Sequence, residues 1–200
     1  MLTSTPKYII GIDEVGRGPL AGPVAVGAFC IPAELNQKMF RGVRDSKQLT
    51  PLARDEWYEK IRKWQSDKLV RFHVSYVGNE SIDRQGINRA IALALKRSLY
   101  KLELLPQDCT VLLDGGLRAP DHFLSQKTII RGDESEPVIS LASIVAKVRR
   151  DRLMAKFSQI FDKYGFERHK GYATREHFER ILEHGPCAIH RMSFLKSLTT

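Results

Sequence analysis

Residues 9–22 have the sequence IIGIDEVGRGPLAG, and this stretch decides how the rest of the chain is interpreted. The apolar run from Tyr8 to Ile12 predicts a buried strand. Two adjacent carboxylates, Asp13 and Glu14, follow it, and glycines begin at Gly16. Because neighbouring side chains of a strand point to opposite faces, the chain is expected to bend here so that both acids reach one site.

The paired acids allow two interpretations. Carboxylates at the end of a buried strand are costly to desolvate unless a positive partner binds them. A hard divalent cation is one such partner, because it prefers oxygen ligands. The alternative is a polar strand end that runs into a solvated turn, and further acids elsewhere in the chain are needed to decide between the two.

Composition limits the class of protein. The 200 residues suffice for one domain with a full core, and the formal net charge is +9. Residues 147–200 contain 12 Lys or Arg and 6 Asp or Glu, which fits either a surface for a phosphate backbone or a solvated helical face. The three cysteines lack metal-binding spacing, which predicts reduced thiols in a cytoplasmic protein. No signal peptide or membrane-spanning stretch is expected.

Periodicity and turn-forming residues predict alternating strands and helices, which is typical of an α/β fold. Strands are expected at 8–12, 24–31, 69–77, 110–113 and 127–130. Helices are expected at 51–64, 85–105, 138–157 and 175–184, with Thr50 and Thr174 as N-caps of two of them. A loop rich in cations and aromatic residues is expected at 164–174, where such a mixture suits stacking beside a phosphate backbone or local packing.

The glycine-rich loop also fits a competing motif. Gly16, Gly18 and Ala21 have the G-x-G-x-x-A spacing of dinucleotide-binding loops. Those loops lead directly into a helix, whereas here prolines lead into a predicted strand. The acids before the loop would also repel a pyrophosphate, so the sequence disfavours a nucleotide cofactor.

Two further acids favour a metal site. Asp114 ends a predicted strand before two glycines, and Asp151 lies on the predicted helix at 138–157. If the two acid-bearing strands are neighbours, Asp114 meets Asp13 and Glu14 at one edge of the sheet. Four converging carboxylates would repel one another, whereas two Mg²⁺ or Mn²⁺ ions would make them a phosphoryl-transfer site. This pattern predicts a metal-dependent nuclease.

The helix at 138–157 has a polar line beside its apolar stripe. Ser143, Lys147 and Asp151 follow one another at intervals of four residues, so they lie along one side. They either belong to the predicted site or form an ordinary surface stripe with a Lys–Asp pair worth about 0.3 kcal/mol. The spacing alone leaves both open.

Six motifs together resemble the ribonuclease HII family. They are GIDEVGRGPLAGPV at 11–24, DSKQL at 45–49, LLDG at 112–115, SLASIVAKVRRD at 140–151, HKGY at 169–172 and HRMSF at 190–194. The resemblance extends from about Tyr8 to Phe194. It implies an RNase H-like mixed five-stranded sheet flanked by helices, within a single catalytic domain over 1–200. A C-terminal helical region from about 160 would bind substrate.

The resemblance also implies roles for individual residues. Those implied to hold Mn²⁺ or Mg²⁺ and to catalyse are Asp13, Glu14, Asp114 and Asp151. Those implied to contact the 2′-hydroxyl of a ribonucleotide through backbone groups are Gly16, Arg17 and Gly18. Tyr172 would stack on the sugar of the following deoxynucleotide. Lys47, Ser143 and Lys147 would contact phosphate or support the site. A 2′-hydroxyl is the group that distinguishes RNA from DNA.

The implied activity is cleavage of the RNA strand of RNA–DNA hybrids and of DNA 5′ of an embedded ribonucleotide, leaving a 3′-hydroxyl and a 5′-phosphate. The implied partners are these nucleic acids, and the protein is expected to be a monomer. Ribonuclease HIII is the alternative enzyme, but it has GKG in place of GRG and an extra N-terminal domain, whereas seven residues precede the first predicted strand here. A non-catalytic nucleic-acid-binding module is a second alternative, which the four repelling acids disfavour. One departure from the family is Gly86, where an Asn is usual.

Overall fold

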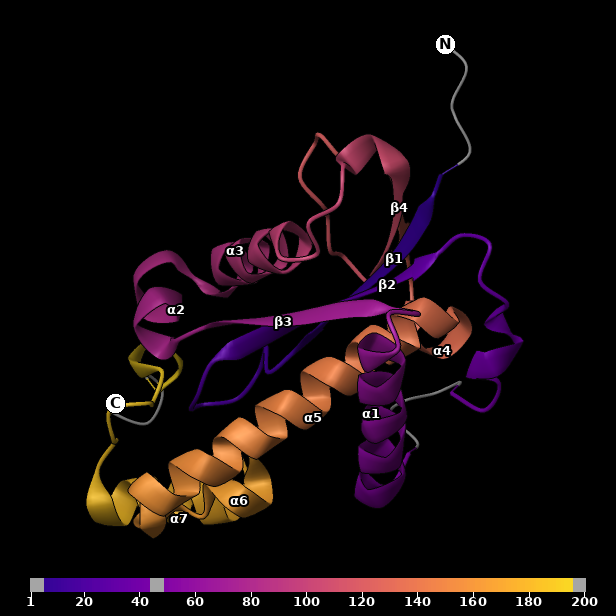
Figure 1. The fold of residues 1–200 in the computed structure, drawn as a ribbon. Helices are drawn as coiled ribbons and strands as arrows, with labels where there is room; N and C mark the ends of the chain where they lie inside the picture. The colour runs from indigo at the N-terminus through magenta and orange to yellow at the C-terminus, as the bar shows by residue number, and fades with distance from the viewer. Residues whose placement is uncertain (1–5, 44–48, 196–200) are drawn as a thin grey trace.

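The computed structural model describes residues 6–43 and 49–195, and its centre is a mixed five-stranded sheet with strand order β3-β2-β1-β4-β5 (Figure 1). The strands are β1 (Tyr8–Val15), β2 (Val24–Pro32), β3 (Arg71–Val77), β4 (Cys109–Asp114) and β5 (Ser125–Ile129). β1 pairs antiparallel with β2 and parallel with β4. The predicted fold class, a mixed five-stranded sheet with helices, is confirmed.

Helices cover both faces of this sheet (Figure 1). One face is covered by α2 (Asn79–Gln85) and α3 (Ile87–Tyr100), and the other by α1 (Pro51–Ser66), α4 (Gly132–Ser135) and α5 (Pro137–Ile160). The short α6 (Phe166–His169) and α7 (Arg175–His184) lie beyond the end of α5. Single 3-10 turns occur at Gln37–Phe40, Pro106–Asp108, Asp162–Tyr164 and Met192–Phe194. Among the described residues, none of the helices is long and apolar enough to cross a membrane.

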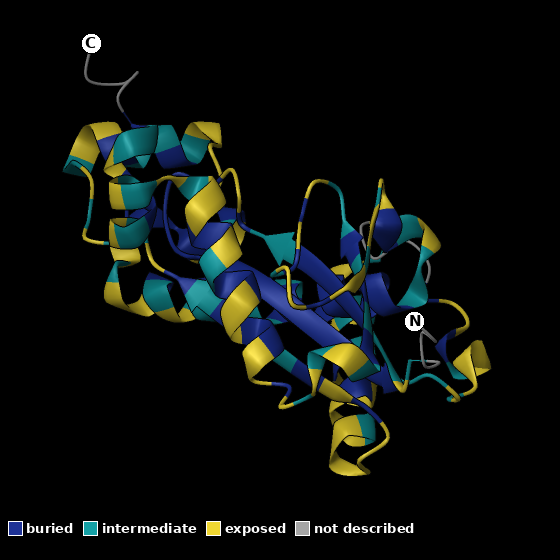
Figure 2. Cartoon of the chain, turned by 90° about the horizontal axis from the view of Figure 1, so that it is seen from above, coloured by how far each residue is buried: buried dark blue, intermediate teal, exposed yellow. Residues whose placement is uncertain are grey.

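Alternation along β1 divides its side chains between the two layers. Ile10 and Ile12 pack into the apolar cluster that contains α3. The intervening Gly11 faces α5, because a Cβ there would lie 2.1 Å from the Val138 carbonyl oxygen. Figure 2 shows the buried strands between the more exposed helices. By the same alternation, Asp13 faces α5 and Glu14 faces α3.

Two glycines let α5 lie directly on the sheet. A Cβ at Gly27 of β2 would lie 2.4 Å from the Ala142 carbonyl oxygen, a clash similar to the one at Gly11 of β1. Any larger residue at either position would push the helix away from the strands. This close packing brings the next turn of α5, which carries Ser143 and Lys147, beside the end of β1.

The prediction that the chain bends at Asp13 and Glu14 is wrong. Pairing between β1 and β2 continues through Asp13, Glu14 and Val15 without interruption. The turn begins one residue later, at Gly16, whose φ of +87° suits glycine. The antiparallel partner keeps the strand straight, so the two acids point to opposite faces of the sheet.

The helix expected at 85–105 is shorter in the structure, where α3 begins at Ile87 and ends at Tyr100, and the separate helix α2 before it was not predicted. Gly86, with a φ of +84°, separates the two helices. A left-handed residue cannot continue a right-handed helix. The predicted N-caps are confirmed, since Thr50 accepts a hydrogen bond from Ala53 and Thr174 accepts one from His177. The stretch at 164–174 contains α6 instead of being loop throughout.

The C-terminal helices pack against the glycine-rich loop. A third apolar cluster joins residues of that loop, of α5 and of the C-terminal segment: Leu20, Ala21, Met154, Tyr164, Phe166, Ile181 and Leu195. Through this cluster the last quarter of the chain covers the loop that follows β1. That residues 1–200 form a single domain stays a prediction.

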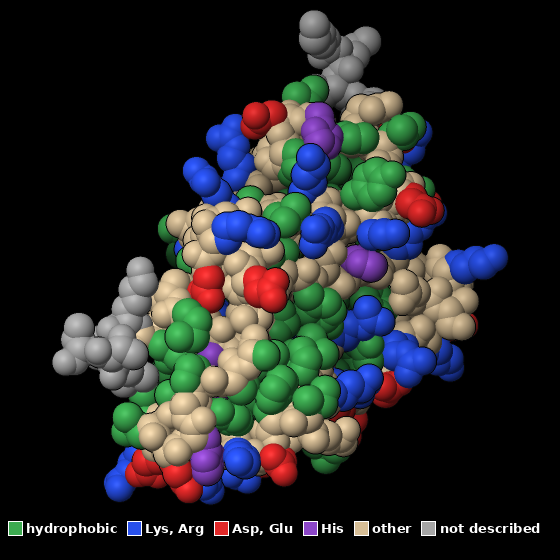
Figure 3. Space-filling view, turned by 90° about the vertical axis from the view of Figure 1, so that its left-hand side faces the viewer, with side chains coloured by type: hydrophobic (Ala, Val, Ile, Leu, Met, Phe, Trp, Pro, Cys, Tyr) green, Lys and Arg blue, Asp and Glu red, His purple; other side chains and the backbone are tan. Residues whose placement is uncertain are grey.

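The cations of residues 147–200 are divided between surface and interior. Figure 3 shows Lys and Arg side chains over the upper part and along one edge of the face that it presents. Several of the basic residues, however, are paired with acids: Arg152 with Asp55 and Glu59, and Arg168 with Glu176. Arg150 and Arg191 are fully buried. The formal charge of this segment therefore overstates the cationic surface that it offers to a phosphate backbone.

Candidate active site at the end of β1

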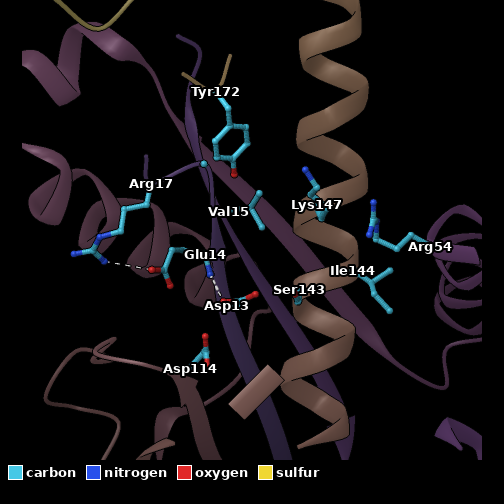
Figure 4. A pocket seen from close by; sticks show the side chains of 11 residues that line it. Asp13, Glu14, Val15, Arg17, Arg54, Asp114, Ser143, Ile144, Lys147 and Tyr172 are labelled. Atoms are coloured by element: carbon cyan, nitrogen blue, oxygen red, sulfur yellow. Dashed lines mark hydrogen bonds and ion pairs between the residues drawn. The ribbon is translucent and has the colours of Figure 1, made fainter. Parts of the chain in front are cut away.

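A cavity of about 410 Å³ opens at the end of β1, between β4, α5 and the loop before α7. Figure 4 shows its lining side chains. Among the residues singled out from the sequence, those that line it are Asp13, Glu14, Gly16, Arg17, Asp114, Ser143, Lys147 and Tyr172. Arg54, Val15 and Ile144 complete the lining. Lys47 lies outside the described residues.

Asp13 is the most deeply buried acid of the cavity, with 5% of its surface exposed. Burial raises its pKa to about 8, a hydrogen bond with Ser143 opposes the rise, and the charges of Asp114, Glu14 and Asp133 add to it. Its Oδ1 accepts a hydrogen bond from the Glu14 amide at 2.8 Å. Asp13 is thus held in a place where a negative charge is unfavourable without a cation.

Glu14 reaches the cavity from the other face of the sheet (Figure 4). Burial raises its pKa, whereas the hydrogen bond and the positive charge of Arg17 lower it. Arg17 lies 3.3 Å from Glu14 and also donates to Asn88 Oδ1 at 2.6 Å. Asn88, at the start of α3, therefore orients Arg17, and it lies two residues after Gly86, the departure from the family pattern.

Asp114 and Asp133 come from neighbouring elements. Asp114 ends β4, and its Oδ1 accepts a hydrogen bond from the Gly132 amide of α4 at 2.7 Å. The next residue of α4, Asp133, is fully buried, and its charge helps to raise the pKa of Asp13. The sequence analysis missed Asp133. It stands in a run of acids before Pro137, and such a run is also typical of a helix N-terminus.

Asp151 is not brought into this cavity. Its Oδ1 accepts a hydrogen bond from Lys147 Nζ at 2.9 Å. It lines a neighbouring cavity of about 530 Å³, which shares Arg54 and Lys147 with the first. The predicted polar line along α5 thus divides, because Ser143 and Lys147 line the first cavity and Asp151 lines the second.

The side chains are not gathered into a finished ligand group. Within residues 6–43 and 49–195, no three His, Cys, Asp or Glu side chains are placed so that they could hold a metal ion together. The donor set nevertheless fits a hard divalent cation, because it consists of carboxylates and one of them is buried with a raised pKa. A cation would offset both the burial and the repulsion from neighbouring acids that raise this pKa.

Arg191 holds the glycine-rich loop from inside. Its guanidinium donates to the carbonyl oxygens of Gly16, Arg17 and Gly22 at 2.7, 2.9 and 2.9 Å. Burial, together with the charge of Arg150, lowers the pKa of Arg191 to about 9. Because the C=O and N–H groups of a trans peptide point in opposite directions, the amides of Arg17 and Gly18 point away from Arg191.

Arg150 connects the same loop to the segment before Tyr172. It donates to the carbonyl oxygens of Pro23, Lys170 and Ala21 at 2.9, 3.1 and 3.4 Å. Burial lowers its pKa. The sequence analysis did not assign a role to Arg150 or Arg191, because their partners are backbone carbonyls far away in the chain, which leave no pattern in the sequence.

Tyr172 points into the cavity opposite the acids (Figure 4). The residue is 39% exposed, and two cations lie near the face of its ring, Lys147 Nζ and Arg150 Cζ, each 5.8 Å from the ring centroid. An exposed aromatic ring beside cations is suited to stacking on a nucleotide next to a phosphate. The structure therefore places Tyr172, the acids and the glycine-rich loop around one cavity.

Comparisons with known proteins point to one family. A family model described as Ribonuclease HII matches residues 10–197. The ribonuclease HII of Caldicellulosiruptor saccharolyticus is 45% identical over 192 residues, which are 96% of this chain and 89% of that relative.

Solved structures have the same fold. The RNase HII in a complex with PCNA from Archaeoglobus fulgidus has a TM-score of 0.71 and 26% identity, over 92% of this chain and 94% of that one. Bst-RNase HIII in complex with Mn²⁺ has a TM-score of 0.69 and 21% identity, over 90% of this chain and 64% of that one. At 21% identity, the similarity to Bst-RNase HIII shows only that the two chains share a fold.

Proposed function

The chain belongs to the ribonuclease HII family and is an endonuclease that acts on RNA–DNA hybrids; from this premise we propose that it also nicks DNA 5′ of an embedded ribonucleotide. The proposed products carry a 3′-hydroxyl and a 5′-phosphate. The observation that supports the proposal is the shared cavity, in which the buried Asp13 and the half-buried Glu14 and Asp114 lie beside the glycine-rich loop and an exposed tyrosine.

Divalent ions, Mg²⁺ or Mn²⁺, are proposed to bind to Asp13, Glu14 and Asp114. When bound, such ions lower the pKa of an attacking water and stabilise the leaving oxygen. Two candidates exist for a fourth carboxylate. Asp133 acts on Asp13 through its charge, whereas Asp151 is paired with Lys147 in the adjacent cavity. We therefore place Asp133 closer to the proposed ions than Asp151, which stays a predicted ligand.

The glycine-rich loop is proposed to recognise the ribonucleotide through its backbone. Arg191 binds the carbonyl oxygens of Gly16 and Arg17. The amides of the same two peptide groups, those of Arg17 and Gly18, point away from Arg191 and can donate to a ligand. A 2′-hydroxyl can accept such hydrogen bonds and is absent from DNA. A Cβ at Gly18 would have no heavy atom within 4 Å, so a sugar can approach the backbone there.

Tyr172, Lys147 and Arg54 are proposed to bind the rest of the nucleotide strand. The Tyr172 ring would stack on the sugar that follows the ribonucleotide. Lys147 and Arg54 line both cavities, so they can bind successive phosphates of one backbone. Ser143 is proposed to support the site through its hydrogen bond with Asp13.

We further propose that the protein works as a monomer in the cytoplasm. Cys30 and Cys109 are free and buried, and burial raises their pKa to about 12 and about 11, so neither is a reactive thiolate at neutral pH. Light scattering of the purified protein at increasing concentration tests the monomer, and a concentration-independent dimer mass would contradict it.

The proposed function is tested with two labelled substrates. One is a DNA duplex with a single embedded ribonucleotide, and the other is an RNA strand paired with DNA. Each is incubated with Mg²⁺, with Mn²⁺ and with chelator. A metal-dependent nick 5′ of the single ribonucleotide is expected. Cleavage of the long hybrid alone would favour ribonuclease HIII-like specificity, and tight binding without cleavage of either would favour a binding module.

A further inference from the structure

Three buried histidines lie directly behind Tyr172. They are His169 in α6, His177 in the first turn of α7 and His190 after α7. His177 Nε2 and His190 Nε2 lie 3.1 Å apart, and His177 Nδ1 lies 2.9 Å from the Tyr172 carbonyl oxygen. These contacts form a continuous path of hydrogen bonds from the C-terminal segment to the backbone of Tyr172.

Backbone groups determine which nitrogen of each ring carries a proton. His190 Nδ1 lies 2.8 Å from the Cys187 amide, which donates to it, and 3.3 Å from the Cys187 carbonyl oxygen, which already accepts from the His190 amide. The shorter contact favours a bare Nδ1 and a proton on Nε2 of His190. His190 Nε2–H then donates to a bare His177 Nε2. The remaining proton of His177 is on Nδ1, where it donates to the Tyr172 carbonyl oxygen. The path is therefore directional, and each ring fixes the tautomer of the next.

The surroundings hold both rings in place and neutral. His177 stacks on His169 with ring centroids 4.3 Å apart. The rings of Phe166 and His177 are nearly perpendicular, with centroids 5.5 Å apart. His169 is fixed in its turn, since its Nδ1 lies 3.2 Å from the Gly171 amide and its Nε2 lies 2.7 Å from the Tyr164 carbonyl oxygen. Burial lowers the pKa of His177 and of His190 to about 4, so both are neutral at pH 7.

Gly171, the residue before Tyr172, is tied to the glycine-rich loop. The Gly171 carbonyl oxygen accepts hydrogen bonds from the amides of Leu20 and Ala21 at 2.8 and 3.3 Å. The Tyr172 carbonyl oxygen accepts one from the Thr174 amide at 2.9 Å in addition to the one from His177. Loss of the His177 hydrogen bond would loosen the peptide that aims the Tyr172 ring, while the rest of the turn would keep its backbone hydrogen bonds.

We propose that His177 is a positioning residue for Tyr172: with its tautomer set by His190, it holds the Tyr172 backbone so that the ring faces the cavity. This inference rests on the proposed function insofar as Tyr172 contributes to recognition of an RNA–DNA junction. His177 touches neither the acids nor the cavity, so its effect is on the selectivity between substrates and not on the chemical step.

Two substitutions separate the hydrogen bonds of His177. In His177→Asn the side-chain amide nitrogen takes the place of Nδ1 and can still donate to Tyr172. In His177→Gln the amide lies at the place of Nε2, where it reaches His190 but not Tyr172. We expect His177→Gln to lower kcat/KM on the single-ribonucleotide duplex about five- to tenfold, the usual effect of one lost hydrogen bond, with little change on the long hybrid.

His177→Asn is expected to keep most of the preference for the single-ribonucleotide duplex. His184→Asn and His184→Gln are the matched controls, because His184 lies on the same helix and contacts Glu183 and the ring of Tyr164, whereas the path of hydrogen bonds runs through His190, His177 and Tyr172. A preference that is equal in wild type and His177→Gln, or lost equally in both His177 variants, would overturn the proposal.

A second measurement needs no variant and no substrate. Nitrogen-15 NMR of the histidine rings of the wild-type protein at pH 7 is expected to show His177 with its proton on Nδ1 and His190 with its proton on Nε2. Two rings with the same tautomer would overturn the path. If the wild-type protein does not nick the single-ribonucleotide duplex, the proposed function fails, whereas the NMR result still decides whether the path exists.

Discussion

Lys147 Nζ lies 2.9 Å from Asp151 Oδ1, and this ion pair stands between two cavities that both contain Lys147. The lysine offsets the charge of Asp151, whereas Asp13 is crowded by three other acids. Asp151 is therefore the acid with the least need for a cation, and Asp13 the one with the most.

Asp13→Asn is expected to lower kcat/KM by more than about 100-fold, beyond the loss typical of a residue that only supports a metal ligand. The variant should still bind the duplex, because Lys147, Arg54 and Tyr172 are unchanged. Cleavage assays and a binding titration in Mn²⁺ check this. Removal of a buried charge should also leave folding intact, and a fully active variant would contradict the metal site.

Asp133→Asn is expected to reduce cleavage more than Asp151→Asn does. Asp133 is buried and acts on Asp13, whereas Asp151 faces the second cavity. Calorimetric titration with Mn²⁺ should show weaker binding for Asp133→Asn in particular. Circular dichroism verifies that each variant is folded. If Asp151→Asn abolishes both metal binding and cleavage, the side chain of Asp151 must leave Lys147 when the ion binds.

Tyr172→Ala is expected to lower kcat/KM on the single-ribonucleotide duplex by about five- to 100-fold, the range for loss of one stacking contact. The effect on a long hybrid should be smaller, because more of its nucleotides contribute to binding. Tyr172→Phe keeps the ring and serves as the matched variant. Equal losses on both substrates would argue against a role in junction recognition.

Gly16→Ala is expected to destabilise the protein by about 2 kcal/mol, because its φ is positive and the new Cβ would lie 2.2 Å from Arg150 Nε. Gly18→Ala is the matched control for stability, since its Cβ would meet no heavy atom within 4 Å. Urea unfolding of both variants tests the difference. Similar midpoints would show that Arg150 moves aside without cost.

Stability should depend on pH through His177 and His190. The folded protein lowers both pKa values to about 4 from the ordinary 6.5. Below pH 6.5 the unfolded chain therefore binds more protons than the folded one. Stability should be full above pH 6.5 and fall as the pH drops towards 4, by at most about 3 kcal/mol per histidine. Urea unfolding from pH 4 to 7 measures this fall, and His177→Asn should reduce it.

Local patterns in the sequence sufficed for much of the fold. Strand periodicity, the N-caps Thr50 and Thr174, and the acid that ends β4 depend on neighbouring residues, and the structure places each as expected. Helix α2 was missed because it is short and mostly polar, with Ile82 as its one buried residue. The apolar stripe that predicted the following helix begins only at Ile87, after Gly86.

The site was predictable only in part, because some of its contacts are not local. Asp13, Glu14 and Asp114 follow from strand ends in adjacent strands. The choice between Asp133 and Asp151 depends on how α4 and α5 sit on the sheet, which spacing along one helix does not reveal. Arg150 and Arg191 bind backbone carbonyl oxygens more than a hundred residues away, so no residue type marks them.

The contact between the two ends of the chain has a consequence for the order of folding. The Arg191 amide donates to the Leu20 carbonyl oxygen at 2.7 Å, and His190 forms a β-bridge with Ala21. Closing so long a loop is slow and comes after local structure has formed. During synthesis the sheet strands are complete long before residues 190–191 leave the ribosome. The nascent chain therefore contains its acids early, but the glycine-rich loop takes its final shape only after residues 190–191 have left the ribosome.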